Sequence, residues 1–116
     1  PGTPELLTIQ ARRALETAEV IVGYRLYVQQ ISDIIAGQEV ITTGMRGEVE
    51  RCRRAIEAAA AGRTVAVVSS GDAGIYGMAG LLLELLEGEY REDDLDLEVI
   101  PGITAASMAA SVLGAP

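Results

Sequence analysis

The residues best suited to binding a ligand form a glycine-rich stretch in the middle of the chain, residues 69–77, Ser-Ser-Gly-Asp-Ala-Gly-Ile-Tyr-Gly. A mostly β-branched run (residues 64–68) precedes it and an apolar run with helical character (residues 78–86) follows, so it should connect a strand to a helix. In an open parallel sheet such connections lie at the carboxyl edge, where ligands bind. Glycines allow a ligand to approach the main chain, and Asp72 can accept hydrogen bonds from hydroxyl or ammonium groups. The same stretch is equally compatible with a tight turn in which Asp72 only caps the helix.

A second stretch of this kind covers residues 100–106, Ile-Pro-Gly-Ile-Thr-Ala-Ala, again between an apolar run and a helical pattern. Its small residues let a neighbouring group lie flat against the backbone, and Thr104 contributes a hydroxyl. Taken alone, the pattern is more typical of a capped helix packed closely on a sheet. Two glycine-bearing strand ends at one edge, each with a polar side chain, favour a shared ligand.

Composition excludes several classes of function. The chain has 116 residues, 49% of them hydrophobic, and a net charge of −8, which favours one globular domain and argues against nucleic acid or an anionic membrane as partner. No apolar run approaches the roughly 20 residues that a membrane span needs. The absence of histidine and lysine excludes a histidine-based metal site, a Ser–His triad and a P-loop lysine, and we predict no metal site. The single cysteine, Cys52, suits a reducing cytoplasm.

Hydrophobic periodicity predicts an alternation of strands and helices. Strands are expected at residues 19–23, 39–42, 64–68 and 97–100. Helices are expected from Thr3, as N-cap, to about residue 18, and at residues 24–36, 48–61, 78–87 and 104–113. This alternation predicts an α/β fold with an open parallel sheet, right-handed crossovers and helices on both faces.

Three segments resemble, in this order, motifs of the N-terminal domain of the tetrapyrrole methylases: residues 1–8, 69–77 and 100–105. The resemblance implies S-adenosyl-L-methionine as cofactor and a tetrapyrrole (precorrin) as substrate. Residues 22–24 with Tyr27, and residues 43–48, are most similar to the members of cobalamin biosynthesis that methylate C17 of precorrin-3B and contract the ring. A methylase acting at another ring position and a non-enzymatic α/β binding module are the alternatives.

The resemblance also implies which residues form the site. Those lining the cofactor would be Gly71, Asp72, Ile75, Tyr76, Thr104 and Ala105. Because methyl transfer from an activated sulfonium depends mainly on positioning, we assign no catalytic acid or base. The substrate carries carboxylates while this domain is acidic, so Arg25 and Arg46, together with Tyr24, are the candidate substrate contacts. The simpler interpretation is that both arginines are solvated surface residues.

Two departures from the family bear on the fold. Family members begin with an apolar strand and a Gly-Pro-Gly-Asp-Pro type loop, whereas here only Pro-Gly-Thr-Pro (residues 1–4) is present. Family members also have a second α/β domain after the Gly-Ala-Pro seen here at residues 114–116, and we expect that domain to be missing from this chain. Residues 1–116 are therefore expected to be a truncated N-terminal half, inactive alone. The family's strand order, 3-2-4-1-5, implies that strands 64–68 and 97–100 flank a gap. Open strand edges favour association, so a homodimer or larger assembly is expected.

Overall fold

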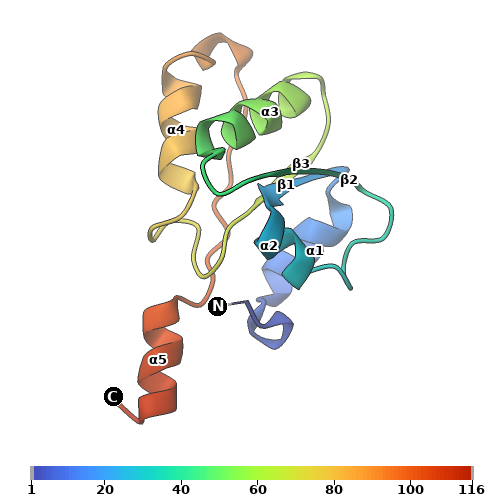
Figure 1. The fold of residues 1–116 in the computed structure, drawn as a ribbon. Helices are drawn as coiled ribbons and strands as arrows, with labels where there is room; N and C mark the ends of the chain where they lie inside the picture. Colours follow the sequence, from blue (N-terminus) through green and yellow to red (C-terminus); the bar gives the residue numbers. More distant parts are fainter. Residues whose placement is uncertain (1, 116) are drawn as a thin grey trace.

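A three-stranded parallel sheet organises the chain, as shown in Figure 1 for a computed structural model that describes residues 2–115. Pro1 and Pro116, the outer residues of the two terminal motifs, lie outside the described residues. The strands are β1 (Val20–Tyr24), β2 (Glu39–Thr43) and β3 (Val65–Val68), in the order β2-β1-β3. The helices are α1 (Ile9–Thr17), α2 (Arg25–Gln30), α3 (Glu48–Ala60), α4 (Ala79–Glu87) and α5 (Ala105–Leu113), with short 3-10 helices η1 (Pro4–Leu6) and η2 (Arg91–Asp93).

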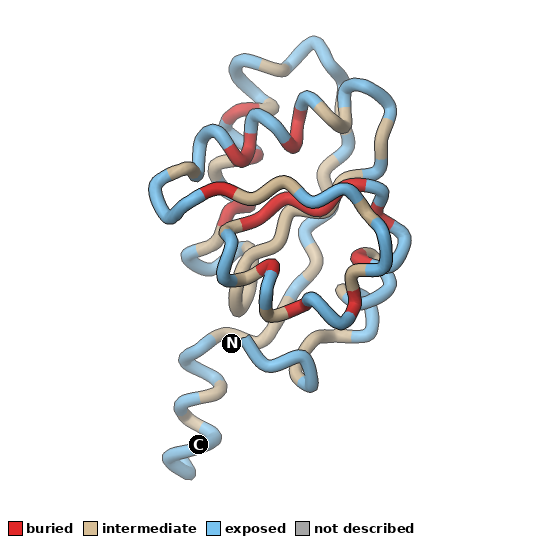
Figure 2. The backbone as a smooth tube through the Cα atoms, turned by 45° about the vertical axis from the view of Figure 1, so that its right-hand side comes forward, coloured by how far each residue is buried: buried red, intermediate tan, exposed pale blue. Residues whose placement is uncertain are grey.

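Strand β1 lies at the centre of the core and is buried on both faces (Figure 2). Ile21 packs in a cluster with residues of α1 and α2, whereas Val20 and Val22 pack with Ala55 of α3. Successive side chains of a strand point to opposite faces, so this alternation requires helices on both sides of the sheet. The predicted fold class, an open parallel sheet with helices on both faces, is confirmed.

A further apolar layer joins α4 to α3 through Leu82, Leu85, Cys52 and Ile56. Burial raises the pKa of the Cys52 thiol, and the nearby Arg51 charge opposes this only in part. Cys52 is therefore a core residue and not an activated nucleophile. Within residues 2–115, no helix combines the length and apolarity needed to cross a membrane, and no cluster of acidic, cysteine or histidine side chains could hold a metal ion.

The amino-terminal helix differs from the prediction. Thr3 makes no capping bond; the chain forms η1, passes through the extended residue Leu7, and begins α1 only at Ile9. The cap is Thr8, whose Oγ1 accepts a hydrogen bond from the Ala11 N–H at 3.1 Å. The predicted cap Thr3 is therefore wrong for the long helix, which Thr8 begins.

Helix α2 is also shorter than predicted, because it ends at Gln30 and not near residue 36. The chain turns over residues 31–34, which places both Ile31 and Ile34 in the core with Ile21. Gly37, which leads into β2, has a φ of +112°, a conformation that glycine adopts easily because it has no Cβ. Burial of the two isoleucines thus outweighs continuation of the helical pattern.

The predicted strand at residues 97–100 is not formed, because these residues pair with no strand of the sheet. Between them and β3 lies a hollow of about 620 Å³, lined from both sides, including Val65, Val67, Leu97 and Val99. A strand needs a hydrogen-bonded neighbour, and the position beside residues 97–100 holds none. The expected gap is confirmed, and it leaves one edge of β3 unpaired.

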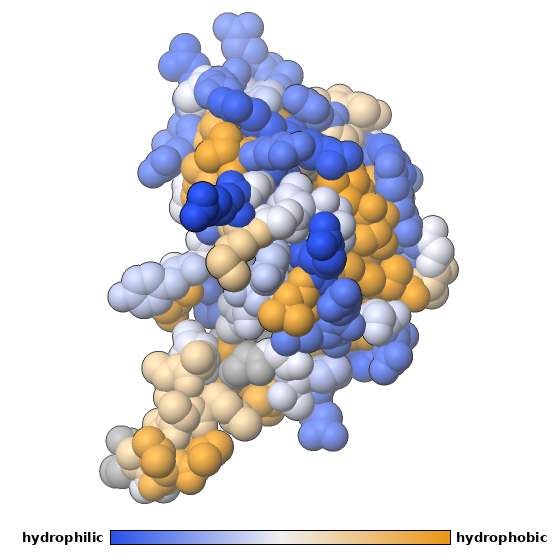
Figure 3. All heavy atoms as spheres, viewed as in Figure 1, coloured by the Kyte–Doolittle hydropathy of each residue, from blue (hydrophilic) through white to orange (hydrophobic). Residues whose placement is uncertain are grey.

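Helix α5 extends away from the sheet and its covering helices (Figure 1). None of its residues is buried, and Val112 and Leu113 near its end are 73% and 80% exposed. Figure 3 shows apolar atoms over this protruding end. The helix therefore presents apolar surface that no other described element of the chain covers.

The central position of Ile21 leads to a stability prediction. Ile21→Ala should lower the free energy of unfolding by about 2–5 kcal/mol, since it removes buried methyl groups and leaves a cavity. Ile9→Ala is the control, because Ile9 is 71% exposed and its loss should stay within about 0.5 kcal/mol. Urea unfolding measures both, and equal losses would contradict the assignment of the core.

Candidate ligand site at the carboxyl edge of the sheet

The loop after β3 and the segment after residues 97–100 are joined by the Asp72 carboxylate. Its Oδ1 accepts a hydrogen bond from the Gly74 N–H at 2.8 Å, and its Oδ2 accepts one from the Gly102 N–H at 2.9 Å. One side chain thus holds together two stretches thirty positions apart in sequence. The expectation that the two glycine-rich stretches lie side by side is confirmed.

Two glycines make this contact close. Gly71 has a φ of +68°, which favours glycine, and a Cβ added at Gly102 would lie 2.2 Å from the Gly71 carbonyl oxygen. No side chain fits at Gly102 without displacing the loop. The glycines therefore serve the packing of the two loops against each other, and they also leave the main chain at this edge bare of side chains. The alternative in which Asp72 only caps the following helix is wrong, because α4 begins after Met78 without a side-chain capping bond and Asp72 bonds Gly102.

Hydrogen bonding stabilises Asp72 as a carboxylate. The Gly102 N–H, and secondarily the Gly74 N–H, hold the pKa of Asp72 below its ordinary value of 3.8. Asp72 is ionised at neutral pH, and each of its oxygens retains a lone pair for a further donor. The carboxylate is thus both a brace between the loops and an acceptor at their surface.

Thr104 and Ala105 lie at the start of α5, next to Gly71. Thr104 Oγ1 accepts a hydrogen bond from the Ser107 N–H at 3.2 Å and so caps the helix. A Cβ built at Gly71 would lie 3.6 Å from Thr104 Cα and 3.9 Å from the Ala105 nitrogen. The structure brings these two predicted residues to the Asp72 loop, with the Thr104 hydroxyl already engaged as a cap.

Ile75 and Tyr76 form the outer part of the same loop. Ile75 is 54% exposed and Tyr76 is fully exposed, with a φ of +54° that is uncommon for a residue other than glycine. Tyr76 thus combines a large exposed aromatic side chain with a backbone conformation that is unfavourable for it. Both side chains offer apolar surface beside Asp72.

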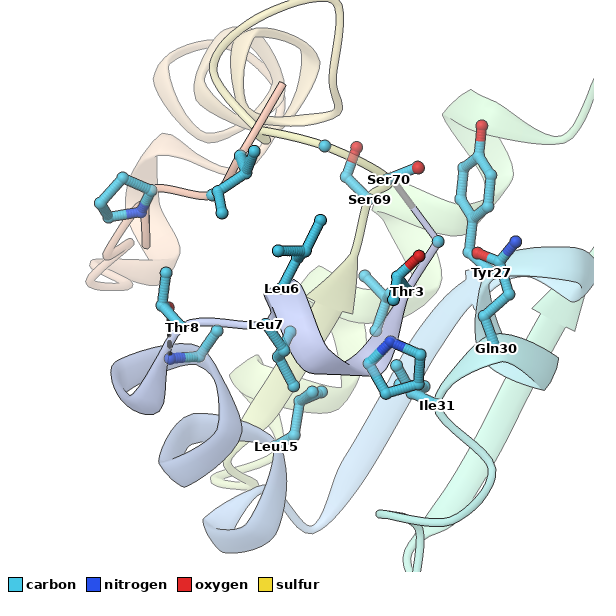
Figure 4. A pocket seen from close by; sticks show the side chains of 18 residues that line it. Thr3, Leu6, Leu7, Thr8, Leu15, Tyr27, Gln30, Ile31, Ser69 and Ser70 are labelled. Atoms are coloured by element: carbon cyan, nitrogen blue, oxygen red, sulfur yellow. Dashed lines mark hydrogen bonds between the residues drawn. The ribbon is translucent and has the colours of Figure 1, made fainter. Parts of the chain in front are cut away.

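A small pocket of about 120 Å³ lies between η1 and the two loops (Figure 4). Thr3 and Leu6 line it from the amino-terminal segment, Ser69 and Ser70 from the end of β3, and Tyr27 from α2. Pockets for ligands of ordinary size measure about 300–1,000 Å³. This pocket by itself thus encloses only part of a ligand of nucleoside size.

The three predicted substrate contacts lie at the ends of β1 and β2. Tyr24 ends β1, and its ring meets that of Tyr27 edge to face at 5.1 Å between centroids. Arg25 begins α2 and Arg46 lies in the loop after β2; both are exposed, and neither forms an ion pair within residues 2–115. The structure does not place Arg25 or Arg46 against the Asp72 loop.

Sequence reasoning missed Arg51. This residue of α3 is only 4% exposed, and its guanidinium lies over the Tyr24 ring at 5.8 Å. One signal was available: Arg51 stands four residues before Ala55, as Cys52 stands before Ile56, and these four form the buried stripe of the helix. Because arginine is charged, a search for apolar periodicity does not count this position as part of the buried stripe.

The low pKa of Asp72 gives a pH prediction. Because the native-state pKa is depressed, the stabilisation from Asp72 is present above the unfolded-state pKa and is lost as the pH falls through the lower, native-state value. The amide resonances of Gly74 and Gly102 should therefore move together, with a midpoint below pH 3.8, in an NMR titration. In Asp72→Asn this coupled movement should vanish; its persistence would assign it to another carboxyl group.

Comparison with known proteins identifies the family of the chain. The family model of the Tetrapyrrole (Corrin/Porphyrin) Methylases matches residues 1–116. The chain is 50% identical over its whole length to the probable cobalt-factor III C(17)-methyltransferase of Salmonella typhimurium, covering 47% of that protein. The crystal structure of the methyltransferase CobJ aligns with 97% of this chain and 46% of its own, with a TM-score of 0.86 and 42% identity.

A more distant structure carries a ligand. The uroporphyrin-III C-methyl transferase from Thermus thermophilus, complexed with S-adenosylhomocysteine, is 31% identical, with a TM-score of 0.71, and aligns with 97% of this chain and 48% of its own. The chain thus spans at most about half the length of the relatives it matches, and 22% of some. Motifs, strand order and similarity over its full length agree that the chain belongs to the tetrapyrrole methylase family.

Proposed function

We propose that this chain is the amino-terminal, cofactor-binding half of an S-adenosylmethionine-dependent C-methyltransferase of cobalamin biosynthesis. The reaction is methylation at C17 of a corrin precursor, with ring contraction. The observation that carries the proposal is the Asp72 bridge, which brings both motif-bearing loops together at the carboxyl edge of a sheet with this family's strand order. The buried free thiol Cys52 supports a reducing, cytoplasmic setting.

The relatives' names favour an acceptor that already carries cobalt. The Salmonella protein and a relative from Methanothermobacter thermautotrophicus, 50% and 48% identical, are both described as probable cobalt-factor III C(17)-methyltransferases. The motifs alone left open whether the macrocycle is metal-free precorrin-3B or its cobalt counterpart. We propose cobalt-factor III as the substrate; its cobalt belongs to the substrate and needs no protein ligand from this chain.

For the cofactor, the residues present fit S-adenosylmethionine, which supplies an activated methyl group when bound. The chain offers bare main chain at Gly71, a carboxylate acceptor at Asp72, and exposed apolar side chains at Ile75 and Tyr76. Thr104 and Ala105 complete the set from the second loop. In this proposal these residues bind and orient the cofactor, and none of them acts as acid or base.

For the substrate, the candidates are Tyr24, Arg25 and Arg46, at the ends of the two neighbouring strands. Exposed guanidinium groups can bind the carboxylates of the macrocycle through bidentate hydrogen bonds. Because the described pocket encloses only part of a ligand, the proposal requires a second protein segment to complete the cleft. We therefore propose that the 116-residue chain has no methyltransferase turnover alone.

Cofactor binding tests the assignment of the site. In a full-length polypeptide that contains this chain, Asp72→Ala should weaken binding of S-adenosylhomocysteine by roughly 1–3 kcal/mol, because a charged acceptor and the brace between the loops are both lost. Isothermal titration calorimetry measures the change. Asp33→Ala is the control, since Asp33 is exposed in the turn after α2. Equal affinity of the two variants would refute the site.

Self-association follows from the open edge of β3 and the uncovered apolar end of α5. Unpaired main-chain groups each cost about 1–3 kcal/mol when they are shut off from water, and a partner chain can satisfy them. We propose that the 116-residue chain forms a homodimer or larger assembly. Sedimentation velocity should show a species of at least twice 12.2 kDa; a compact monomer at all concentrations would contradict this.

A further inference from the structure

Arg51 is a buried cation whose charge has no carboxylate partner among residues 2–115. Its Nε donates a hydrogen bond to Thr43 Oγ1 at 2.6 Å, and its Nη2 donates to the Gly44 carbonyl oxygen at 3.3 Å. The Tyr24 ring lies 5.8 Å away, at cation–π distance. This guanidinium is thus held by neutral hydrogen-bond acceptors and by an aromatic face, with no anion beside it among residues 2–115.

Burying a guanidinium without a paired anion lowers the stability of the fold. Arginine is almost never buried without a paired charge, because desolvation of an ion costs several kcal/mol. An uncharged residue on the same helical stripe would pack against Tyr24 without that cost. The retained guanidinium therefore points to a role that a merely apolar side chain could not fill.

The contacts of Arg51 tie together the substrate end of the site. Thr43 and Gly44 begin the loop that carries Arg46, and a Cβ at Gly47 would lie 2.7 Å from the Thr43 side chain, so this loop is folded closely on itself. On the other side, Arg51 holds Tyr24, whose ring meets Tyr27. Tyr27 in turn lines the pocket that Ser69 and Ser70 share (Figure 4).

We propose that Arg51 is a positioning residue for substrate recognition. Its two hydrogen bonds orient the loop of residues 43–47, and its cation–π contact orients the Tyr24–Tyr27 pair, so that Arg46 meets a carboxylate of the macrocycle. The planar guanidinium can contact Thr43, Gly44 and the Tyr24 ring at once, which a lysine ammonium on its flexible stem cannot do in the same geometry. This inference rests on the proposed function and adds to it the residue that shapes the substrate end.

The test is steady-state kinetics of a full-length polypeptide containing this chain, with cobalt-factor III as methyl acceptor. Arg51→Lys should raise KM for the acceptor about tenfold or more, the effect of losing a hydrogen bond to a charged group. The kcat should stay within about threefold, and affinity for S-adenosylhomocysteine should not change. Arg54→Lys is the matched control, because Arg54 lies exposed on the same helix.

Two further variants keep the test decisive if Arg51→Lys fails to fold. Thr43→Val keeps the shape of the side chain but removes the Nε acceptor, and it should raise KM as Arg51→Lys does, whereas Thr43→Ser should restore it. Where Arg51→Lys folds, its effect on KM should also be strongly non-additive with that of Arg46→Ala, since Arg51 acts through Arg46. Unchanged KM in folded variants, or additive effects, would overturn the role of Arg51. Failure of the wild-type protein to bind S-adenosylhomocysteine would instead reject the proposed function itself.

Discussion

The carboxylate of Asp72 is the constraint on which the candidate site depends. Residues 97–100 are not paired with β3, so the sheet does not hold the segment that follows them. The hydrogen bond from the Gly102 N–H to Asp72 does so, and in the described chain only the exposed contact of Gln10 with Glu98 adds a second side-chain link to this segment. The Asp72 hydrogen bond and the close packing of Gly102 on Gly71 thus fix the segment that leads to Thr104, Ala105 and α5.

Charge and close packing act together at this edge. The two glycine loops meet at main-chain distance, which leaves room for no side chain at Gly102. The Asp72 carboxylate accepts from the Gly74 N–H in its own loop and from the Gly102 N–H across the contact, and both N–H groups stabilise its charge. In an otherwise acidic chain, the opposite end of the same edge carries the buried cation Arg51. The edge thus carries an acceptor at the proposed cofactor loops and positive charge toward the proposed substrate end.

The chain also shows what a parallel sheet loses when one position is empty. β1, with a neighbour on each side, is buried on both faces, whereas β3 has one free edge and only partly buried residues. The hollow lies along this free edge of β3, whereas the exposed surface of α5 belongs to a helix that extends away from the sheet.

Periodicity and turn residues alone determined the order of the elements, the parallel sheet, the two-sided core around β1, and the meeting of the two glycine loops, because these depend on local patterns and on the geometry of parallel strands. Tertiary structure decided the rest. Where α2 ends depends on burial of Ile31 and Ile34 against Ile21. That residues 97–100 form no strand depends on a missing neighbour. Both the Gly102 partner of Asp72 and the burial of Arg51 under Tyr24 come from contacts between residues far apart in sequence, which no local pattern specifies.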